Sequence, residues 1–387
     1  MKKKVAVLGA TGSIGTSALD VLRAGPDDFE VVLLSCHGNT RGLRELLREF
    51  PAARPAVSGP VPSEEAAGVK AYSGSQGLLR AIAESGADVV VNGIAGAAGL
   101  PPSLAALEAG ADLALANKET IVMAAPLVCA LAERYHKKIL PVDSEHSAIF
   151  NLLEAHGKEG LDKILLTASG GPFRTLPAER FKFITPEEAL VHPTWNMGPK
   201  ITVDSATLAN KGLEVIEAAG LFGVGPEKIS VVIHPQSIVH SMIALRDGGV
   251  YAQLSKPDMR FPIHNALYWP ERRFFPFGAL PFEGLTLEFD PPDYKKFPLL
   301  PLAYEAVKRG GCYPAVYNAA NEAAVTAFLA KKIGFLDISA VVEYVFNREG
   351  SNAHFSTSSP DLETILEADR QAREWALSYI TERNGCS

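Results

Sequence analysis

The sequence has few of the features that mark disulfide-rich, zinc-binding or membrane proteins. Its 387 residues contain only four cysteines, which stand far apart and form no CxxC or Cys/His pair at zinc spacing: Cys36, Cys129, Cys312 and Cys386. We therefore expect reduced thiols, and neither a disulfide framework nor a cysteine-based zinc site. No apolar run approaches the roughly 20 residues that a membrane helix needs, so no membrane partner is expected.

The chain also lacks a signal peptide core and a basic surface. Lysines precede Val5–Leu8, but glycine and threonine interrupt the apolar stretch before it reaches the roughly 7–15 residues of a signal sequence. The net charge is −7, with no basic tract beyond Lys2–Lys4, which argues against nucleic acid as a partner. The composition, 47% hydrophobic and 21% charged, is typical of a soluble globular protein. We expect a cytoplasmic protein whose partner is a small-molecule substrate. The overall negative charge does not exclude an anionic substrate, which needs only one locally positive pocket.

The chain is long enough for two or three domains, and its first part alternates strand and helix patterns. Most of the strand segments are apolar throughout, as strands covered by helices on both faces should be. These segments predict a Rossmann-like dinucleotide-binding domain over residues 1–142. The predicted strands are Val5–Leu8, Phe29–Ser35, Asp88–Asn92, Leu113–Ala116 and Lys138–Val142.

The rest of the chain predicts three further segments. Residues 143–273 form a central α/β catalytic domain with strands at Lys163–Thr167, Ile229–His234 and Val250–Leu254, and residues 274–301 form a linker rich in Pro and Phe. Residues 302–387 form a C-terminal helical bundle, with helices expected at 318–332, 338–347 and 359–383. Ser359 and Pro360 suit the N-cap and first position of the last helix. The fold class is therefore α/β with an appended helical domain.

A glycine loop, Gly9–Gly15, follows the first strand and precedes the helix Thr16–Arg23. Its glycines permit a tight turn, close approach to a pyrophosphate and close packing of helix on strand, and the helix N-terminus offers N–H groups to phosphate. A glycine triplet alone can be a plain turn. Its position between the first strand and helix favours a dinucleotide site.

The end of the second strand favours NADPH over NADH. Enzymes that use NAD usually place an acidic residue there for the ribose 2′-hydroxyl, whereas this chain has Ser35-Cys36-His37-Gly38-Asn39-Thr40-Arg41. A 2′-phosphate would meet small residues, an amide and Arg41. The alternative is that Arg41 and Arg44 form a solvated helix face.

Two acidic residues, Asp143 and Glu145, follow the fifth predicted strand. If the extended conformation continues, their carboxylates project to the same side and repel unless a cation lies between them. Oxygen ligands of this kind suit Mg²⁺ or Mn²⁺. Taken alone, the pair is also common on protein surfaces.

Polar segments further on predict an anion site. Asn210, Lys211 and Glu214 share one face if the segment is helical, although a solvent-facing ion pair would look the same. Ser169–Pro172 and Val203–Thr207 are predicted to be polar loops rich in Gly, Ser and Thr. Together, these groups could hold a phosphate.

These motifs, in this order, resemble those of the 1-deoxy-D-xylulose 5-phosphate reductoisomerase family over almost the whole chain. The matching segments are Leu8–Gly15, Ala116–Glu119, Pro141–His146, Ala168–Phe173, His192–Gly198, Val203–Thr207, Asn210–Glu214, Ile233–Ser237 and Asn318–Glu322. Any one of them is weak evidence, whereas the ordered set is specific.

The resemblance implies a role for each matching residue. The metal ligands are Asp143, Glu145 and Glu214, and the catalytic residues are Lys118, Glu145 and His192. Substrate contacts are Lys118, Ser144, Glu145, Ser169, His192, Trp195, Ser205, Asn210, Lys211 and Glu214, of which Ser169, Ser205, Asn210 and Lys211 hold the phosphate with help from His192. Contacts to NADPH are Thr11, Gly12, Ser13, Ile14, Gly38, Asn39, Asn117, Glu119 and Gly198.

The segment His192–Gly198 matches a mobile flap in which Trp195 covers the substrate and Met197 approaches the nicotinamide. From the residues alone, Trp195 would be a core aromatic. One departure concerns the cofactor: many relatives have a Gly-basic-Asn run where this chain has His37-Gly38-Asn39, so the residue that contacts the 2′-phosphate is not identified by the match.

The resemblance implies an NADPH- and metal-dependent rearrangement and reduction of 1-deoxy-D-xylulose 5-phosphate to 2-C-methyl-D-erythritol 4-phosphate, in the methylerythritol phosphate route to isoprenoids, by a homodimer. The rearrangement can proceed by retro-aldol cleavage or by a 1,2-shift, with Glu145 as proton carrier and Lys118 stabilising negative charge. Two alternatives are a semialdehyde dehydrogenase with a cysteine nucleophile and a non-catalytic dinucleotide sensor. No cysteine here lies in a Gly-rich or His-rich motif, and a sensor has little use for three carboxylates and two phosphate loops.

Overall fold

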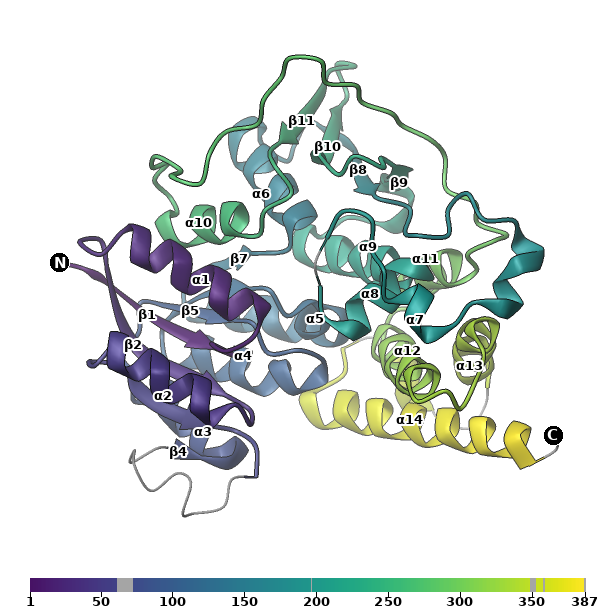
Figure 1. Ribbon diagram of the computed structural model, residues 1–387, viewed down its shortest axis with the longest axis horizontal. Coiled ribbons are helices and arrows are strands. Elements are labelled where there is room, and N and C mark those ends of the chain that lie inside the picture. Colours follow the sequence, from purple (N-terminus) through teal and green to yellow (C-terminus); the bar gives the residue numbers. More distant parts are fainter. Residues whose placement is uncertain (61–71, 196, 349–352, 358, 386–387) are drawn as a thin grey trace. The chain divides into compact units, whose positions relative to one another are not determined.

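The computed structural model describes residues 1–60, 72–195, 197–348, 353–357 and 359–385 (Figure 1). The chain forms two compact units, each assembled from separate segments. Met1–Thr120, Val128–Asn151 and Asp258–Leu280 make the first unit, and Ile121–Leu127, Leu152–Pro257 and Pro281–Ser387 make the second. The division into consecutive domains at residues 142, 273 and 301 remains a prediction.

A seven-stranded parallel sheet forms the centre of the first unit, with the strand order β4-β3-β2-β1-β5-β6-β7. The order reverses beside β1, as in doubly wound dinucleotide-binding folds, which confirms the predicted Rossmann-like architecture. Short β3 and β4 were not predicted from the sequence. The strands are β1 Lys3–Leu8, β2 Phe29–Cys36, β3 Arg54–Val57, β4 Tyr72–Ser73, β5 Val89–Asn92, β6 Asp112–Leu115 and β7 Ile139–Pro141.

Helices cover both faces of this sheet, which explains why its strands are apolar throughout. One face packs Val5, Val7 and Val91 against side chains of α1, α2 and α10, including Leu19, Leu43 and Ile263. The helices α3 and α4 contact each other. Helix α3 also contacts β2, β3 and β4, and α4 contacts β5 and β6. The helices that begin in this unit are α1 Ser13–Ala24, α2 Thr40–Glu49, α3 Gly74–Ala83, η1 Ala97–Gly99, α4 Leu100–Glu108, α5 Lys118–Arg134, α6 Ser144–His156 and α10 Arg260–Tyr268.

The helix α10 belongs to this unit although it lies far along the chain. Lys3 Nζ donates to the carbonyl oxygens of Leu267 at 2.8 Å and Trp269 at 3.2 Å. The Tyr268 hydroxyl donates to Asp28 Oδ2 at 2.7 Å, and burial together with this carboxylate raises the pKa of Tyr268 to about 12. The sequence pattern gave no sign of this return.

The second unit contains a four-stranded sheet with the order β11-β10-β8-β9, in which only β8 and β9 are parallel. Its strands are β8 Leu161–Ala168, β9 Ile229–Ile233, β10 Val239–Leu245 and β11 Val250–Leu254. The sequence analysis missed β10. Between β8 and β9 the chain forms η2 Ala178–Phe183, α7 Pro186–Ala189, α8 Pro199–Ala206, α9 Ala209–Phe222 and η3 Pro226–Lys228.

Residues 281–298 contain neither helix nor strand apart from one bridge that pairs Asp290 with Ile233. His234 fixes this segment to the sheet, since Nδ1 donates to Glu288 O at 2.9 Å and Nε2 accepts from Val239 N at 3.1 Å. The His234 ring also stacks on Phe289 with centroids 4.8 Å apart. His234, singled out above by its motif, therefore has a structural role here.

Helices make up the rest of the second unit, and α14 runs alongside α12 and α13 (Figure 1). Helix α12 is almost entirely buried, so it forms the centre of the predicted helical bundle. In the described part of the chain, no helix is both long and apolar enough to cross a membrane. The helices are α11 Leu299–Arg309, α12 Tyr313–Leu329, α13 Phe335–Asn347, η4 Ala353–Ser356 and α14 Leu362–Gly385.

The predicted start of the last helix is wrong by two residues. Helix α14 begins at Leu362 rather than beside Ser359 and Pro360, because the Asp361 carboxylate accepts from Thr364 N at 2.8 Å. Hydrogen bonds from the Thr364 hydroxyl and from Thr364 N hold the pKa of Asp361 below its usual value. Asp361 is therefore the N-cap, a role for which Asp and Ser are about equally suited.

Replacing Asp361 by Ala should lower the melting temperature by about 2 °C, because the first turn of α14 loses its side-chain acceptor. Ser359→Ala, at the N-cap position expected from the sequence, is the matched control and should leave the melting temperature unchanged. Differential scanning calorimetry compares the two variants. A larger loss in the Ser359 variant would contradict the observed cap.

Candidate functional site

The glycine loop of the first unit is shaped for a close approach by a ligand. Gly9 has φ of +75°, and an added Cβ at Gly15 would lie 2.3 Å from Gly9 O, so neither position accepts a larger residue without strain. No side chain in the described part of the chain caps the N-terminus of α1 at Gly12. Its first N–H groups, at Ser13 and Ile14, therefore face the position that a pyrophosphate takes in this fold.

The end of β2 holds no acidic residue, as predicted. Asn39 caps α2 by accepting from Gly42 N at 2.9 Å, and His37 Nδ1 lies 3.2 Å from Ser58 Oγ. The Arg41 side chain is 91% exposed and lies 3.4 Å from Glu45. Asn39 thus shapes the loop, while Arg41 and Arg44 are both exposed on α2.

Asn117, a predicted cofactor contact, is buried and tied to the neighbouring loop. Its Nδ2 donates to the carbonyl oxygens of Ile94 at 2.8 Å and Gly96 at 2.9 Å and to Glu119 Oε2 at 2.9 Å. Its Oδ1 accepts from Thr120 N at 3.0 Å and caps α5. The Asn117 side chain therefore fixes the loop after β5 and the helix start that carries Lys118.

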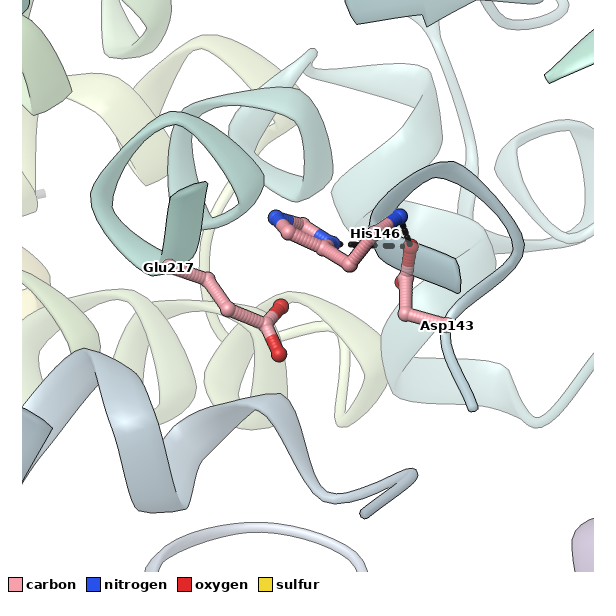
Figure 2. A group of neighbouring side chains, drawn as sticks. All are labelled: Asp143, His146 and Glu217. Carbon is pink, nitrogen blue, oxygen red and sulfur yellow. Dashed lines mark hydrogen bonds and ion pairs between the residues drawn. The ribbon is translucent and has the colours of Figure 1, made fainter. Parts of the chain in front are cut away.

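Asp143 is the N-cap of α6, so the extended conformation that would have placed Asp143 and Glu145 on the same side of a strand does not continue past β7. Asp143 Oδ1 accepts from Glu145 N at 3.1 Å and His146 N at 3.4 Å. The same oxygen lies 3.0 Å from His146 Nδ1, and Oδ2 lies 3.0 Å from Lys118 Nζ. Figure 2 shows the His146 ring beside the Asp143 carboxylate, with the two side chains joined by a dashed line.

Glu145 begins the same helix, and Ser144 Oγ donates to its Oε2 at 2.7 Å. Both acids and Ser144 therefore lie within one turn, at the helix end whose dipole favours negative charge. The first turn of α6 therefore brings Asp143 and Glu145 near each other, as an extended segment was expected to do. Lys118 is largely buried beside Asp143 and balances part of this charge.

In the second unit, Ser169 and His192 are hydrogen-bonded, with Ser169 Oγ 3.1 Å from His192 Nε2. His192 Nδ1 accepts from Thr194 N at 3.1 Å and Trp195 N at 2.9 Å, so the neutral ring carries its proton on Nε2 and donates to Ser169. Burial lowers the pKa of His192, which favours this neutral form. Ser169 Oγ also accepts from Gly171 N at 3.3 Å, which leaves its hydroxyl hydrogen for a ligand oxygen.

The loop that carries Ser169 lies directly against α8. Gly170 and Gly171 have φ of +83° and +70°, and an added Cβ at Gly171 would lie 2.5 Å from Ser205 O. Ser205 therefore lies next to this loop although it is far away in sequence. The segment Val203–Thr207 is not the loop that was expected: Val203–Ala206 form the last turn of α8, and Thr207 is its C-cap.

Asn210, Lys211 and Glu214 share one face at the start of α9, as predicted. Asn210 Nδ2 donates to Glu214 Oε1 at 2.6 Å, and Lys211 Nζ donates to Glu214 Oε2. Lys211 is 4% exposed and Glu214 is 1% exposed, which rules out the solvent-facing ion pair. A buried pair of this kind is costly unless further groups solvate it.

Trp195 is half-buried rather than a core aromatic, and its ring centroid lies 6.5 Å from that of His240. Gly198 is the N-cap of α8, and its carbonyl accepts from Thr202 Oγ1 at 2.8 Å. Met197 is also half-buried. Asn196 lies outside the described residues.

Sequence reasoning missed several polar residues that surround the predicted ones. They are His146 beside Asp143, His240 beside Trp195, and the pair Asp204 and Asn321 beside Ser205. The spacing of Asp143 and His146 could have indicated the first contact once α6 was known to begin there. The others join segments that no local pattern relates.

Comparisons with known proteins point to one family. Residues 5–125 match the model described as 1-deoxy-D-xylulose 5-phosphate reductoisomerase. Residues 139–222 match the C-terminal domain of 1-deoxy-D-xylulose 5-phosphate reductoisomerase, and residues 254–375 match the DXP reductoisomerase C-terminal domain.

Relatives and solved structures extend this match to the whole chain. The reductoisomerase of Chlorobaculum tepidum is 50% identical over 98% of this chain and 100% of its own, and that of Synechocystis is 47% identical over 100% and 99%. The Zymomonas mobilis enzyme in complex with NADPH is 42% identical, with a TM-score of 0.89 over 98% of this chain and 99% of its own. A DOX-P reductoisomerase in complex with NADPH, fosmidomycin and magnesium is 39% identical, with a TM-score of 0.93 over 98% of both chains.

The environment of His192 predicts its titration. Its lowered pKa means that the neutral ring stabilises the fold, and this contribution is present above about pH 6.5 and is lost as the pH falls below it. Protonation would place a hydrogen on Nδ1, opposite two backbone N–H donors. Two-bond ¹H–¹⁵N correlation spectra should give a pKa below 6.5 and the Nε2–H tautomer. A pKa above 6.5, or the Nδ1–H tautomer, would contradict the assignment.

Proposed function

Because the chain belongs to the 1-deoxy-D-xylulose 5-phosphate reductoisomerase family, we propose that it converts 1-deoxy-D-xylulose 5-phosphate to 2-C-methyl-D-erythritol 4-phosphate with NADPH and Mg²⁺. The observation that carries this proposal is the similarity over the full length, including solved relatives in complex with NADPH and magnesium. The two units hold separate parts of the predicted site, and each part has a chemistry that fits the reaction.

The glycine loop is the proposed site of the NADPH pyrophosphate. Its support is the uncapped start of α1 and the glycines that leave no room for a Cβ. Thr11, Gly12, Ser13 and Ile14 would contact the phosphates through this loop. Arg41 is the proposed partner of the 2′-phosphate, since it is exposed beside an end of β2 that carries no acid. Gly38, Asn39, Asn117, Glu119 and Gly198 are the remaining proposed cofactor contacts.

Asp143, Glu145 and Glu214 are the proposed metal ligands. Their carboxylate oxygens are hard donors of the type that Mg²⁺ prefers, and Mn²⁺ could bind the same set. Bound metal would supply Lewis acidity and orient the substrate oxygens. The ion pairs with Lys118 and Lys211 support this proposal, since they fix the positions of the Asp143 and Glu214 carboxylates.

The phosphate of the substrate is proposed to bind in the second unit. Ser169 offers a hydroxyl hydrogen, because both its acceptor positions are used by His192 and Gly171. Ser205 lies beside this loop, and Asn210 and Lys211 occupy the first turn of α9, where the helix dipole favours an anion. We call Ser169, Ser205, Asn210 and Lys211 the phosphate cradle, with His192 orienting Ser169 and Trp195 covering the substrate.

Lys118 and Glu145 are the proposed groups for charge and proton handling. The Lys118 ammonium can stabilise negative charge that develops on a substrate oxygen, while Ser144 orients the Glu145 carboxylate through its hydroxyl. Binding of the remote phosphate can then be used to position the reacting carbons against these groups.

A cysteine-dependent dehydrogenase is a weaker alternative. Burial raises the pKa of the thiols of Cys36, Cys129 and Cys312, that of Cys312 to about 11. Thiols of this kind are poor nucleophiles at neutral pH. Cys386 lies outside the described residues.

We also propose a cytoplasmic homodimer. The outer edge of β11 pairs with no strand in the described part of the chain, and Val250 and Tyr251 on it are exposed. An antiparallel edge strand can pair with the same strand of a second copy about a two-fold axis. This supports a continuous sheet across two chains.

The proposed reaction predicts that the absorbance of NADPH at 340 nm falls when 1-deoxy-D-xylulose 5-phosphate and Mg²⁺ are added to the enzyme. When NADH replaces NADPH, the absorbance should fall far more slowly. Removal of the metal with EDTA should abolish turnover, and Mg²⁺ should restore it. Turnover that persists undiminished after chelation would overturn the metal-dependent reaction.

Glu214→Gln should lower kcat by about 100-fold or more, because the amide removes a metal ligand and the charge that pairs with Lys211. The Kd of NADPH, measured by fluorescence titration, should stay within twofold, since the glycine loop belongs to the first unit. Normal turnover in this variant would remove Glu214 from the metal site.

If two chains pair through β11, light scattering should give the mass of a dimer for the wild-type protein and the mass of a monomer for Ala252→Pro. Proline removes a backbone donor and is poorly tolerated where strands pair. Pro281→Ala, in the irregular segment 281–298, is the control and should remain dimeric. A dimeric Ala252→Pro variant would contradict pairing through β11.

A further inference from the structure

Asp204 on α8 is an almost completely buried carboxylate outside the predicted site, with 1% of its surface exposed. Its Oδ1 accepts from Asn321 Nδ2 at 2.8 Å, and its Oδ2 lies 2.9 Å from Lys200 Nζ. A carboxylate is rarely buried to this degree unless charged and hydrogen-bonding partners compensate. The two oxygens therefore link α8 to α12 and close an ion pair within α8.

The contact with α12 fixes the position of this carboxylate. Asn321 and Tyr317 lie one turn apart on this helix, and both are 0% exposed. The Tyr317 hydroxyl donates to Leu299 O at 3.1 Å, and an added Cβ at Gly212 of α9 would lie 2.8 Å from the hydroxyl oxygen. Burial and, to a smaller extent, the charge of Asp204 raise the pKa of Tyr317. One face of α12 thus contacts both α8 and α9.

The residues next to these contacts belong to the phosphate cradle. Ser205 follows Asp204, and Lys211 precedes Gly212. Lys200, the ionic partner of Asp204, lies two residues beyond Gly198, where the segment His192–Gly198 joins α8. The Asp204 carboxylate therefore connects the base of that segment to the helix turn that presents Ser205.

We propose that Asp204, held by Asn321 and paired with Lys200, is a positioning residue for the phosphate cradle. The inference rests on the function proposed above. Asp204 sets the last turn of α8, and with it Ser205, against the rigid face of α12. Lys200 neutralises a carboxylate that would otherwise repel the substrate phosphate from within the same turn.

Asp204→Asn tests this role with little change in shape. The new amide can still accept from Asn321, but it no longer pairs with Lys200, and its NH₂ group would face the ammonium. We expect the KM for 1-deoxy-D-xylulose 5-phosphate to rise about tenfold, as for loss of one charged hydrogen bond. The Kd of NADPH should change by less than about threefold, since the glycine loop belongs to the first unit, and kcat should fall by a smaller factor than KM rises.

Asp369→Asn is the matched control. Asp369 is a buried carboxylate on α14 of the same unit, and it pairs with Arg373 at 2.7 Å. Its variant should lose thermal stability without a change in KM. If Asp204→Asn lowers the melting temperature as Asp369→Asn does and leaves the KM within twofold, Asp204 is only structural and the proposal is overturned.

Two further measurements keep the test decisive. If Asp204→Asn does not fold, Lys200→Met leaves the carboxylate in place, and an unchanged KM in that variant overturns the proposal. If the wild-type protein does not turn over the substrate, the proposed function fails on its own. The Kd of inorganic phosphate, measured by calorimetry, then decides the inference, which requires weaker binding in Asp204→Asn than in the wild type.

Discussion

Neutralisation of buried carboxylates by lysine is the constraint on which the rest of this structure depends. Three carboxylates with little exposure each have a lysine partner: Asp143 with Lys118, Glu214 with Lys211, and Asp204 with Lys200. Each pair brings a charge into the interior that water would otherwise solvate, at a cost that only close partners offset. Two of these pairs, Asp143 with Lys118 and Glu214 with Lys211, include the residues proposed above to bind a metal ion or a phosphate, and the third lies beside Ser205.

The parts of the fold that follow from local patterns could be predicted from the sequence. The glycine loop, the apolar strands of the first sheet and the shared face of Asn210, Lys211 and Glu214 depend on neighbouring residues and on strand or helix periodicity. These patterns also led to the predicted architecture, which the strand order of the first sheet confirms.

Other features depend on competition between local alternatives or on distant contacts. Asp143 could continue a strand or cap a helix. It caps a helix, because its Oδ1 accepts hydrogen bonds from Glu145 N and His146 N. Asp361 rather than Ser359 begins α14 for the same reason. Burial of Lys211 and Glu214, and the bond between Asp204 and Asn321, depend on packing between helices that no short pattern relates. The resemblance to the family assigned a role to individual residues such as Ser205, whereas the sequence context of Ser205 indicated only a segment rich in hydroxyl groups.

Helix α10 has a consequence for the order in which this protein can be made. Ile263, Ala266 and Leu267 pack in the same core as Val5 and Leu19, and Lys3 bonds to carbonyl oxygens at the end of that helix. A nascent chain that has delivered every strand of the first sheet still exposes this apolar face until α10 leaves the ribosome. Synthesis therefore passes through a long interval in which the dinucleotide fold is incomplete and its uncovered strands are open to chaperones.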